Sequence, residues 1–313
     1  MLEAREVSNM RSLSYGRVII ILSLLLIVGG CSASRTVLVE SEHAVKPELD
    51  TLVSAFKGDV GVYAKNLRTG EEVEINADDL FPTASMVKVP ILLTLFQKIQ
   101  NGDIDYDSTF IWSSDLVNYT DDGILSCFKD SSSISLSKII SLMITYSDNL
   151  ASLWCQQLSG GGLEINRWLD ANGFPQTRMN SRTPDRQDDW EIYGWGQTTP
   201  REMAGLLQLI HEQKAVSPWA SEEMYRYLTR IYWDDEALSS VPRTVQVASK
   251  QGAVNASRSE VLLVNAPGDD YVFCVITNNQ EDESWEENNA GFALLRDISA
   301  LLWNAWGSAS STE

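Results

Sequence analysis

Sequence typical of β-strands occurs near both ends of this chain and is almost absent between them. Two β-rich runs lie near the N-terminus and three near the C-terminus: Val60–Asn66, Glu71–Asn76, Thr244–Ser249, Glu260–Asn265 and Tyr271–Thr277. Neither group is expected to make a stable sheet by itself. The sequence therefore predicts one antiparallel, five-stranded sheet that both ends of the chain build together.

Helical periodicity dominates the long segment between these strands, from Thr83 to about Tyr232. Helices are also expected before and after the strands, at Pro47–Phe56 and Trp285–Trp306. The terminal helices would cover one face of the sheet, and the helical insert would cover the other face and build a second lobe. This predicts an α/β fold with α+β lobes, in which a cleft between the lobes is the natural site.

The first residues are typical of a targeting segment. Arg11 and Arg17 precede an apolar run, Val18–Val28, which has about half the length of a membrane span. The run ends at Val28-Gly29-Gly30-Cys31-Ser32, which resembles the lipobox of bacterial lipoproteins. An ordinary signal peptide with an incidental cysteine is the alternative.

We expect residues 1–30 to be a lipoprotein signal peptide and Cys31 to become the acylated N-terminus. Residues 31–46 would form a tether, residues 47–306 the folded domain and residues 307–313 a tail. The protein would then be exported and anchored to the membrane through Cys31, facing the periplasm or the cell wall.

The charged residues exclude several functions. A formal net charge of −19 argues against nucleic-acid binding, which needs a basic surface. His43 and His211 are the only histidines, and neither stands in a metal-binding motif. No GxSxG, GxGxxG or Walker motif is present. Because His43 lies in the expected tether and His211 lies in the middle of a helix, a serine nucleophile here needs a base other than histidine.

A lysine three residues after a serine on a helix lies on the same face and can act as that base, if burial or a neighbouring cation lowers its pKa. Four such pairs occur: Ser54–Lys57, Ser85–Lys88, Ser126–Lys129 and Ser135–Lys138. Only Ser85 begins a helix that is apolar all round, which puts its hydroxyl at the positive end of a buried helix. Pro90, expected in the second turn, breaks a local helix rule, and such violations cluster at functional sites.

Two further motifs combine polar groups that could act on a substrate. Ser147-Asp148-Asn149 lies between two helices, so its hydroxyl could relay a proton and its amide could bind a carbonyl group; a plain helix N-cap is the alternative. Lys250-Gln251-Gly252-Ala253 is expected to end a strand and offers a positive charge, a glycine that permits close approach, and the Ala253 N–H. A strand end with an exposed lysine is the alternative.

In this order and at these intervals, the three motifs resemble those of the active-site serine enzymes that recognise penicillin, and class A β-lactamases in particular. Flanking residues agree: Asp115-Leu116-Val117-Asn118-Tyr119, Thr198-Thr199-Pro200, Met203-Ala204 and Val247-Ala248-Ser249. The resemblance covers about Asp50 to Trp306, and the predicted strand order is also that of the family.

The resemblance implies a role for each residue of the acylation machinery. Ser85 would be the acylated nucleophile, with Lys88 as its base or as part of the proton network. Ser147 would pass a proton to the leaving nitrogen, with electrostatic support from Lys250. No cofactor and no metal are expected.

The resemblance also implies substrate-binding groups. Asn149 would bind the side-chain amide of the substrate, and the N–H groups of Ser85 and Ala253 would form the oxyanion hole next to Gly252. Arg258 is a candidate for a bidentate hold on the substrate carboxylate, with a plain surface arginine as the alternative.

Three departures from the family pattern bear on function. Gln251 stands where the family has threonine or serine; it can still donate a hydrogen bond to a carboxylate, but its longer side chain changes the pocket. The family's Glu-x-x-Leu-Asn loop, whose glutamate activates the deacylating water, has no counterpart in residues 182–191, where Asp185 is a possible substitute. The family's common disulfide is missing, because Leu92 and Ile140 occupy those positions.

We therefore expect a monomeric serine hydrolase that is acylated by β-lactams or related acyl-amide substrates, with slow deacylation as a possible property. Two alternatives stay open: a cell-wall DD-peptidase or transpeptidase-like enzyme that acts on peptidoglycan stem peptides, and a lipoprotein that binds β-lactams or peptidoglycan but turns over poorly. The missing glutamate separates the first function from the others. The intact Ser85, Lys88 and Ser147 count against a pure binding protein.

Overall fold

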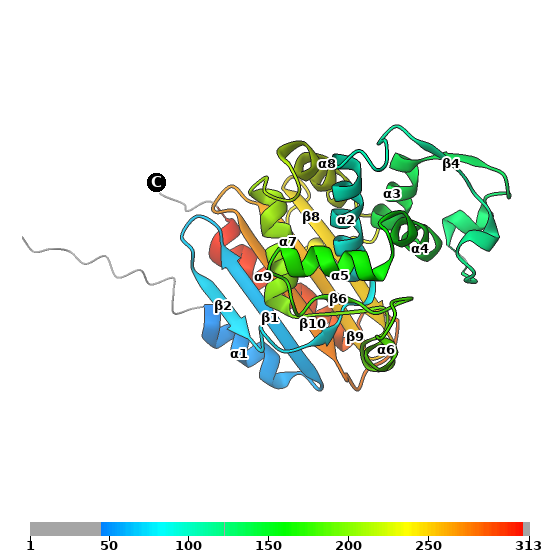
Figure 1. Cartoon of the computed structure of the whole chain (residues 1–313). Coiled ribbons are helices and arrows are strands. Elements are labelled where there is room, and N and C mark those ends of the chain that lie inside the picture. The colour runs from blue at the N-terminus through cyan, green and yellow to red at the C-terminus, as the bar shows by residue number, and fades with distance from the viewer. Residues whose placement is uncertain (1–44, 122, 309–313) are drawn as a thin grey trace, which may run out of the picture. The chain divides into compact units, whose positions relative to one another are not determined.

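The computed structural model describes residues 45–121 and 123–308, and it confirms the predicted sheet (Figure 1). Five antiparallel strands run in the order β2-β1-β10-β9-β8. Their bounds are β1 Asp59–Asn66, β2 Glu72–Ile75, β8 Gln246–Val254, β9 Ser257–Asn265 and β10 Tyr271–Asn278. The pairing of β1 with β10, from Asp59 opposite Asn278 to Asn66 opposite Tyr271, joins the two ends of the chain.

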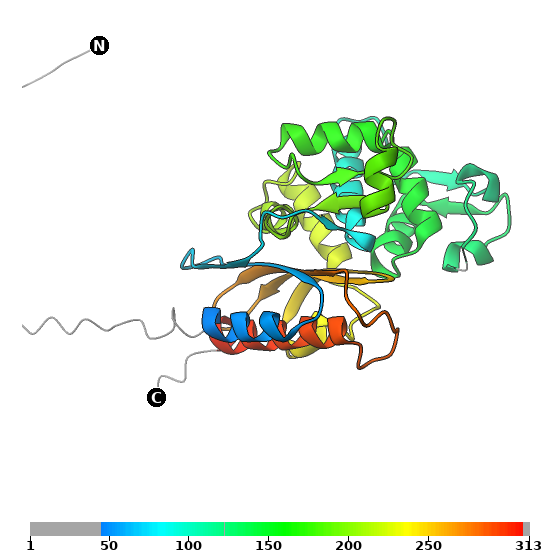
Figure 2. The same cartoon turned by 90° about the horizontal axis from the view of Figure 1, so that it is seen from below.

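One face of the sheet is covered by the two terminal helices, α1 (Val45–Ala55) and α9 (Ala290–Leu302), as Figure 2 shows. Leu49 of α1 and Ile298 of α9 are fully buried in one apolar cluster with residues of β1 and β10. Burial of these apolar side chains away from water stabilises the layer and ties the N-terminal and C-terminal strands together from one side.

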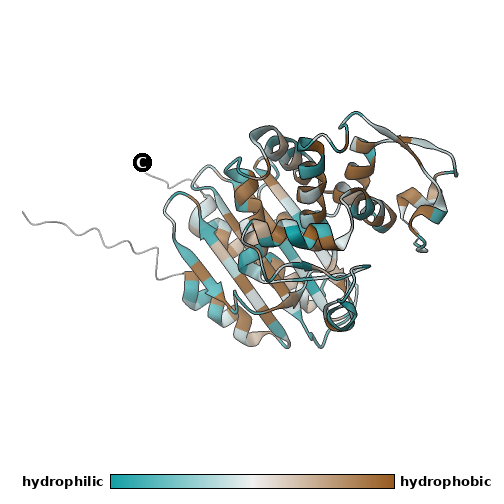
Figure 3. Ribbon diagram, viewed as in Figure 1, coloured by the Kyte–Doolittle hydropathy of each residue, from teal (hydrophilic) through white to brown (hydrophobic). Residues whose placement is uncertain are grey.

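The helical insert covers the other face and builds a second lobe (Figure 2). Helix α7 (Pro200–His211) packs against β1, β9 and β10. Helix α2 (Lys88–Gln100) is buried on nearly every side, which explains why its sequence is apolar all round. The other helices of this lobe are α3 Leu136–Thr145, α4 Asn149–Leu158, α5 Gly162–Ala171, α6 Gln187–Tyr193 and α8 Pro218–Leu228. Apolar residues run along α3 and the strands of the sheet (Figure 3).

The insert also contains short strands that the sequence did not predict. A three-stranded sheet has the order β3 (Phe81–Pro82), β7 (Gly196–Thr198) and β6 (Arg178–Met179), and β4 (Thr109–Ile111) pairs with β5 (Ser133–Ser135). Strands of two or three residues are too short to show an alternating pattern. Their main effect is positional, because β3 leads directly into the residues around Ser85.

Three local predictions were wrong. Strand β8 does not end before Lys250 but continues to Val254, paired throughout with β9. The last helix does not start at Trp285; it starts at Ala290, where the Asn289 side chain accepts hydrogen bonds from the next turn. Pro90 lies in the first turn of α2, where its missing N–H has no intrahelical partner to lose, so it breaks no helix rule.

The predicted signal peptide and the lipidation site Cys31 lie outside the described residues, as do most of the tether and of the tail. Within residues 45–121 and 123–308, no helix combines the length and the apolar character that a membrane crossing requires.

Candidate active site

Ser85 lies in a 3₁₀ turn, Ala84–Val87, between β3 and the start of α2. The backbone of Thr83, just before the turn, donates to Gly196 of β7 at 2.9 Å, and the Met86 N–H donates back to Thr83 O at 3.0 Å. Ala84 has a φ of 44°, a left-handed conformation that residues other than glycine seldom adopt. Strain of this kind is retained where the surrounding structure enforces it, and here it fixes the position of Ser85.

Lys88 connects the other polar residues of the site. Its Nζ lies 2.9 Å from Ser85 Oγ, 2.9 Å from Ser147 Oγ and 3.0 Å from Asn149 Oδ1. The side chain is fully buried, and this desolvation lowers the pKa of Lys88 to about 7, although Asp148 and Asp121 act in the opposite direction. A large fraction of Lys88 is therefore neutral near pH 7 and able to accept a proton.

Both interpretations of Ser147-Asp148-Asn149 apply, but to different residues. Asp148 is the N-cap of α4: its carboxylate accepts from Ala151 N at 2.8 Å, and it also accepts from Leu125 N at 2.8 Å. Ser147 has a φ of 60°, and its hydroxyl lies between Lys88 and Lys250. The cap thus fixes the loop that holds the hydroxyl in place.

Lys250 reaches the same hydroxyl from the sheet. Its Nζ lies 3.1 Å from Ser147 Oγ and 2.7 Å from Gln251 Oε1. Burial and the neighbouring charge of Lys88 lower the pKa of Lys250 well below its ordinary value. In this structure the carbonyl of Gln251 is engaged by Lys250, so the departure at position 251 adds a hydrogen-bond acceptor next to the lysine.

Gly252 is the position at which β8 approaches the Ser85 turn. A Cβ there would lie 2.7 Å from Thr83 O and 2.9 Å from Ser85 N, which is closer than real side chains come. Only glycine permits this approach. The consequence is that the Ser85 backbone nitrogen lies beside β8, near Ala253, which also lines the cavities at Ser85.

Two carboxylates near Lys250 were not predicted from the sequence. Glu260 of β9 is fully buried, accepts from Ser249 Oγ, and has its pKa raised by burial to about 7. Glu236 precedes the 3₁₀ helix Ala237–Ser240, and burial together with Glu260 raises its pKa well above the ordinary value. Glu260 is the first residue of the strand predicted from the sequence, where a charged side chain gives no sign of burial, and Glu236 follows two other acids, Asp234 and Asp235, so neither could be singled out from the sequence.

Arg258 is not where the predicted carboxylate contact requires it. Its guanidinium is fully buried and donates to the backbone carbonyls of Val254, Asn255, Ser257 and Ser284, at 2.6–3.1 Å. The guanidinium also lies over the rings of Trp285 and Phe292, 4.5 and 4.7 Å from their centres. A bidentate hold on a substrate would require these bonds to break, so the structure argues against this assignment.

Asp185 is also outside the site. Its side chain is exposed, and it does not line the cavities that contain Ser85. The cavity between Ser85 and the 192–195 segment has a volume of about 440 Å³, and among the described residues that line it none is an aspartate or a glutamate. The described residues that line this cavity therefore offer no carboxylate for deacylation.

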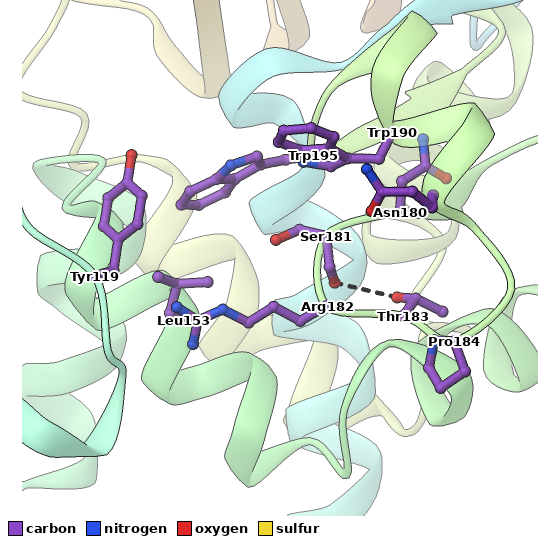
Figure 4. Close-up of a pocket in the computed structure, with 10 residues that line it drawn as sticks. Tyr119, Leu153, Asn180, Ser181, Arg182, Thr183, Pro184, Trp190 and Trp195 are labelled. Carbon is purple, nitrogen blue, oxygen red and sulfur yellow. Dashed lines mark hydrogen bonds between the residues drawn. The ribbon is translucent and has the colours of Figure 1, made fainter.

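A neighbouring cavity of about 550 Å³ lies under the 180–195 segment (Figure 4). Figure 4 shows Tyr119, Trp195 and Arg182 around it, and the rings of Tyr119 and Trp195 meet edge to face with centres 5.6 Å apart. Tyr119 and Trp195 also line the 440 Å³ cavity at Ser85. The 180–195 segment therefore contributes aromatic walls to the site, and no acid that reaches Ser85.

The main cleft, called the Ser85 cleft below, has a volume of about 680 Å³ and lies between β8 and the helical lobe. It is lined by Ser85, Tyr146, Ser147, Asn149, Trp233, Asp235, Glu236, Gln251, Gly252, Ala253, Trp285, Glu287, Phe292 and Arg296. The other Ser-x-x-Lys serines lie elsewhere: the hydroxyls of Ser54 and Ser126 donate to backbone carbonyls, and that of Ser135 bonds to Ser137.

Comparison with known proteins agrees with this geometry. The model of the beta-lactamase enzyme family matches residues 44–306. Beta-lactamase VEB-1 of Pseudomonas aeruginosa is 23% identical over 269 residues, which are 82% of this chain and 88% of that protein. A solved structure of PBP-A is 25% identical, with a TM-score of 0.73, and the match covers 86% of this chain and 96% of the PBP-A chain. The structure of a class A beta-lactamase from Mycobacterium abscessus is 21% identical, with a TM-score of 0.72, and the match covers 84% of this chain and 100% of that one.

Proposed function

The chain belongs to the beta-lactamase enzyme family, and from this premise we propose that it is a serine hydrolase in which β-lactams or related acyl-amide substrates acylate Ser85. The observation that carries the proposal is the position of Lys88. Its buried Nζ lies 2.9 Å from the hydroxyls of both Ser85 and Ser147. One amine can therefore take a proton from the nucleophile and return it toward the leaving group.

Acylation would proceed in two proton-coupled steps. Neutral Lys88 removes the proton of Ser85 Oγ while that oxygen forms a bond to the substrate carbonyl carbon. The resulting oxyanion is held by the N–H groups of Ser85 and Ala253. When the oxyanion collapses, the carbon–nitrogen bond breaks; the leaving nitrogen takes a proton from Ser147, and Ser147 regains one from Lys88. Lys250, 3.1 Å from Ser147 Oγ, stabilises the negative charge that develops on that oxygen.

Deacylation would be slow, since the resemblance places the base that activates water in the loop of residues 182–191, and the 440 Å³ cavity on that side of Ser85 offers no carboxylate among its described lining residues. Loss of a general base typically costs about 10²–10⁴-fold in the step that needs it. We propose that the acyl-enzyme accumulates.

A DD-peptidase or transpeptidase-like enzyme is the second candidate, and a specific observation favours it. PBP-A covers most of this chain, and a PBP-A variant has been solved as an acyl-enzyme complex with penicillin G, at 24% identity and a TM-score of 0.74. A long-lived penicillin adduct is what the missing base predicts here. A binding protein without turnover is less well supported, since Ser85, Lys88, Ser147 and Lys250 form one connected set of hydrogen bonds.

We also propose that the enzyme is a lipoprotein, held at the membrane by Cys31 and exposed to the periplasm or the cell wall. The support is the sequence alone: small residues precede Cys31, and the apolar run before it is too short to span a bilayer. A β-lactam or a peptidoglycan stem peptide would reach the Ser85 cleft in that location.

A time course of nitrocefin opening, combined with intact-mass detection of the acyl-enzyme, tests the proposal. We expect a burst of about one equivalent per enzyme, followed by a steady state limited by deacylation. Ser85→Ala should abolish both the burst and the mass adduct, whereas Ser54→Ala, the matched change at another Ser-x-x-Lys site, should leave them unchanged. Rapid turnover without a detectable adduct would refute slow deacylation, and an adduct on Ser85→Ala would refute the nucleophile.

A further inference from the structure

We propose that the Ser85 cleft accepts acyl donors that carry a positively charged nitrogen near the scissile bond, and that Glu236 is the counter-ion of that nitrogen. The inference rests on the proposed acylation of Ser85 and names the substrate class for it. Its basis is the composition of one end of the cleft, where carboxylates and aromatic rings gather next to the reactive residues.

The carboxylates come from two segments that meet at the cleft. Asp235 and Glu236 lie before the 3₁₀ helix Ala237–Ser240, and Glu287 lies before α9; these two elements pack against each other. The Oε2 atom of Glu236 is buried and has no hydrogen-bond partner among the described residues. A buried, unpartnered carboxyl oxygen is costly, and burial raises the pKa of Glu236 well above its ordinary value. A cation bound in the cleft would donate a hydrogen bond to this oxygen and favour the charged form of Glu236.

Aromatic side chains line the same space. Tyr146, Trp233, Trp285 and Phe292 all border the cleft, and Trp285 keeps 64% of its surface exposed. Trp233 is held in place by its indole N–H, which donates to Tyr146 O at 2.9 Å. The Arg258 guanidinium already lies over the rings of Trp285 and Phe292, so Tyr146 and Trp233 supply the further rings for a substrate ammonium group. Ring faces attract such cations.

The cations near this end of the cleft are already engaged. Arg296 lines the cleft, but its guanidinium donates to the backbone carbonyls of Asp235 and Glu287, at 3.3 and 2.7 Å. Arg258 is enclosed by four carbonyls, and Lys250 is bonded to Ser147 and Gln251. Apart from Arg258 Nε, which has no hydrogen-bond partner, the unpartnered buried polar atom at this end among the described residues is Glu236 Oε2.

A competing explanation gives Glu236 a purely structural role as the counter-charge of Lys250 and Arg258, both of which act on its pKa. The two explanations differ in what they predict for substrates. A structural counter-charge affects every acyl donor alike, whereas a substrate counter-ion affects only cationic donors.

Two sources supply the same cationic chemistry: a β-lactam with a quaternary ammonium arm, and a peptide stem with a free side-chain ammonium. We would measure acylation rates by intact mass for two matched pairs. One pair is a cephalosporin with a quaternary ammonium arm and a cephalosporin of the same core with a neutral arm. The other is an acyl-D-alanyl-D-alanine peptide with a free lysine ammonium and its acetylated form.

We expect wild type to favour the cationic member of at least one pair, and Glu236→Gln to reduce that preference about five- to ten-fold. If the cephalosporin pair shows this loss of preference, the cationic substrate is a β-lactam; if the peptide pair shows it, the substrate is a peptide stem. Asp234→Asn removes the same charge two residues away, at an exposed position that does not line the cleft, and should leave the preference unchanged. Glu287 is an exposed residue of the cleft, and Glu287→Gln should also lower the preference for the cationic donor. This variant replaces Glu236→Gln in the test if Glu236→Gln does not fold.

The outcomes separate the inference from the proposed function. Acylation of wild type without any preference for charge, or an equal loss of rate for both members of a pair in Glu236→Gln, overturns the inference and leaves the serine hydrolase intact. If no donor in either pair acylates Ser85, the proposed function fails, and the inference fails with it.

Discussion

At the scale of single residues, the sequence was enough to predict which side chains could take part in catalysis, but not which residues would surround them. The motifs identified Ser85, Lys88, Ser147 and Lys250, and the structure brings all four within hydrogen-bond distance of a neighbour in one chain of contacts. The partners of Arg258 could not be predicted, because its four backbone acceptors are set by the loops around it. A side chain's role depends on neighbours that only the fold supplies.

The pKa of Lys88 leads to a prediction for the pH dependence of acylation. Burial lowers that pKa from 10.5 to about 7, so the neutral form that accepts the Ser85 proton increases as the pH rises through 7. The acylation rate should therefore rise about ten-fold between pH 6 and pH 8, which rapid-quench intact-mass measurements can follow.

Glu260 is the control for this profile, since burial raises its pKa to about 7 as well. The rise should persist in Glu260→Gln and disappear in Lys88→Arg, whose guanidinium does not lose its proton in this range. A flat profile for wild type from pH 6 to pH 8 would show that Lys88 is not the base.

At the scale of elements, long periodic segments were predictable and short or interrupted ones were not. Helix α2 shows its burial directly in an apolar sequence, whereas β3 and β6 have two residues each and no pattern to detect. In β8, Gly252 resembles a strand end, but pairing with β9 continues past it. The glycine is there because the strand runs against the Ser85 turn, a tertiary constraint that a local pattern does not contain.

Gly252→Ala should impair acylation by about 10²–10³-fold, a loss comparable with removal of one oxyanion-hole donor. The added Cβ would meet Thr83 O and Ser85 N, both of which are backbone atoms that cannot rotate away. The rate of the nitrocefin burst measures the loss, and thermal unfolding of the same variant checks that the fold survives. Normal acylation in a folded Gly252→Ala would mean that β8 does not need its close approach to Ser85.

At the scale of the whole molecule, the order of helices and strands was enough to predict the sheet and its two covering layers. Two N-terminal and three C-terminal strands leave few stable alternatives to one shared sheet. The cleft follows from that arrangement, because Lys250 comes from the sheet whereas Ser85 and Ser147 come from the insert. The Glu236 end of the cleft could not be predicted, since it depends on how two loops pack beside α9.

Membrane attachment is the prediction that belongs to the chain as a whole. If Cys31 carries the lipid, Cys31→Ser should move the protein from the membrane fraction to the soluble fraction of cells. The acyl chains on Cys31 would supply the membrane affinity, so most of the protein should leave the membrane fraction when that cysteine is replaced. Immunoblots of fractionated cells measure this, and an unchanged membrane share of Cys31→Ser would rule out lipidation at that residue.

The pairing of β1 with β10 also determines when the protein can fold during its synthesis. Asp59 lies opposite Asn278, more than 200 positions later in the chain, and β10 is the central strand of the sheet. While the ribosome is still making the insert, the first hairpin has no partner, and closing so long a loop carries an entropic cost. Native structure should therefore form only after release of the nascent chain, so if the chain is exported, as we propose, it would meet the export channel while it is still unfolded.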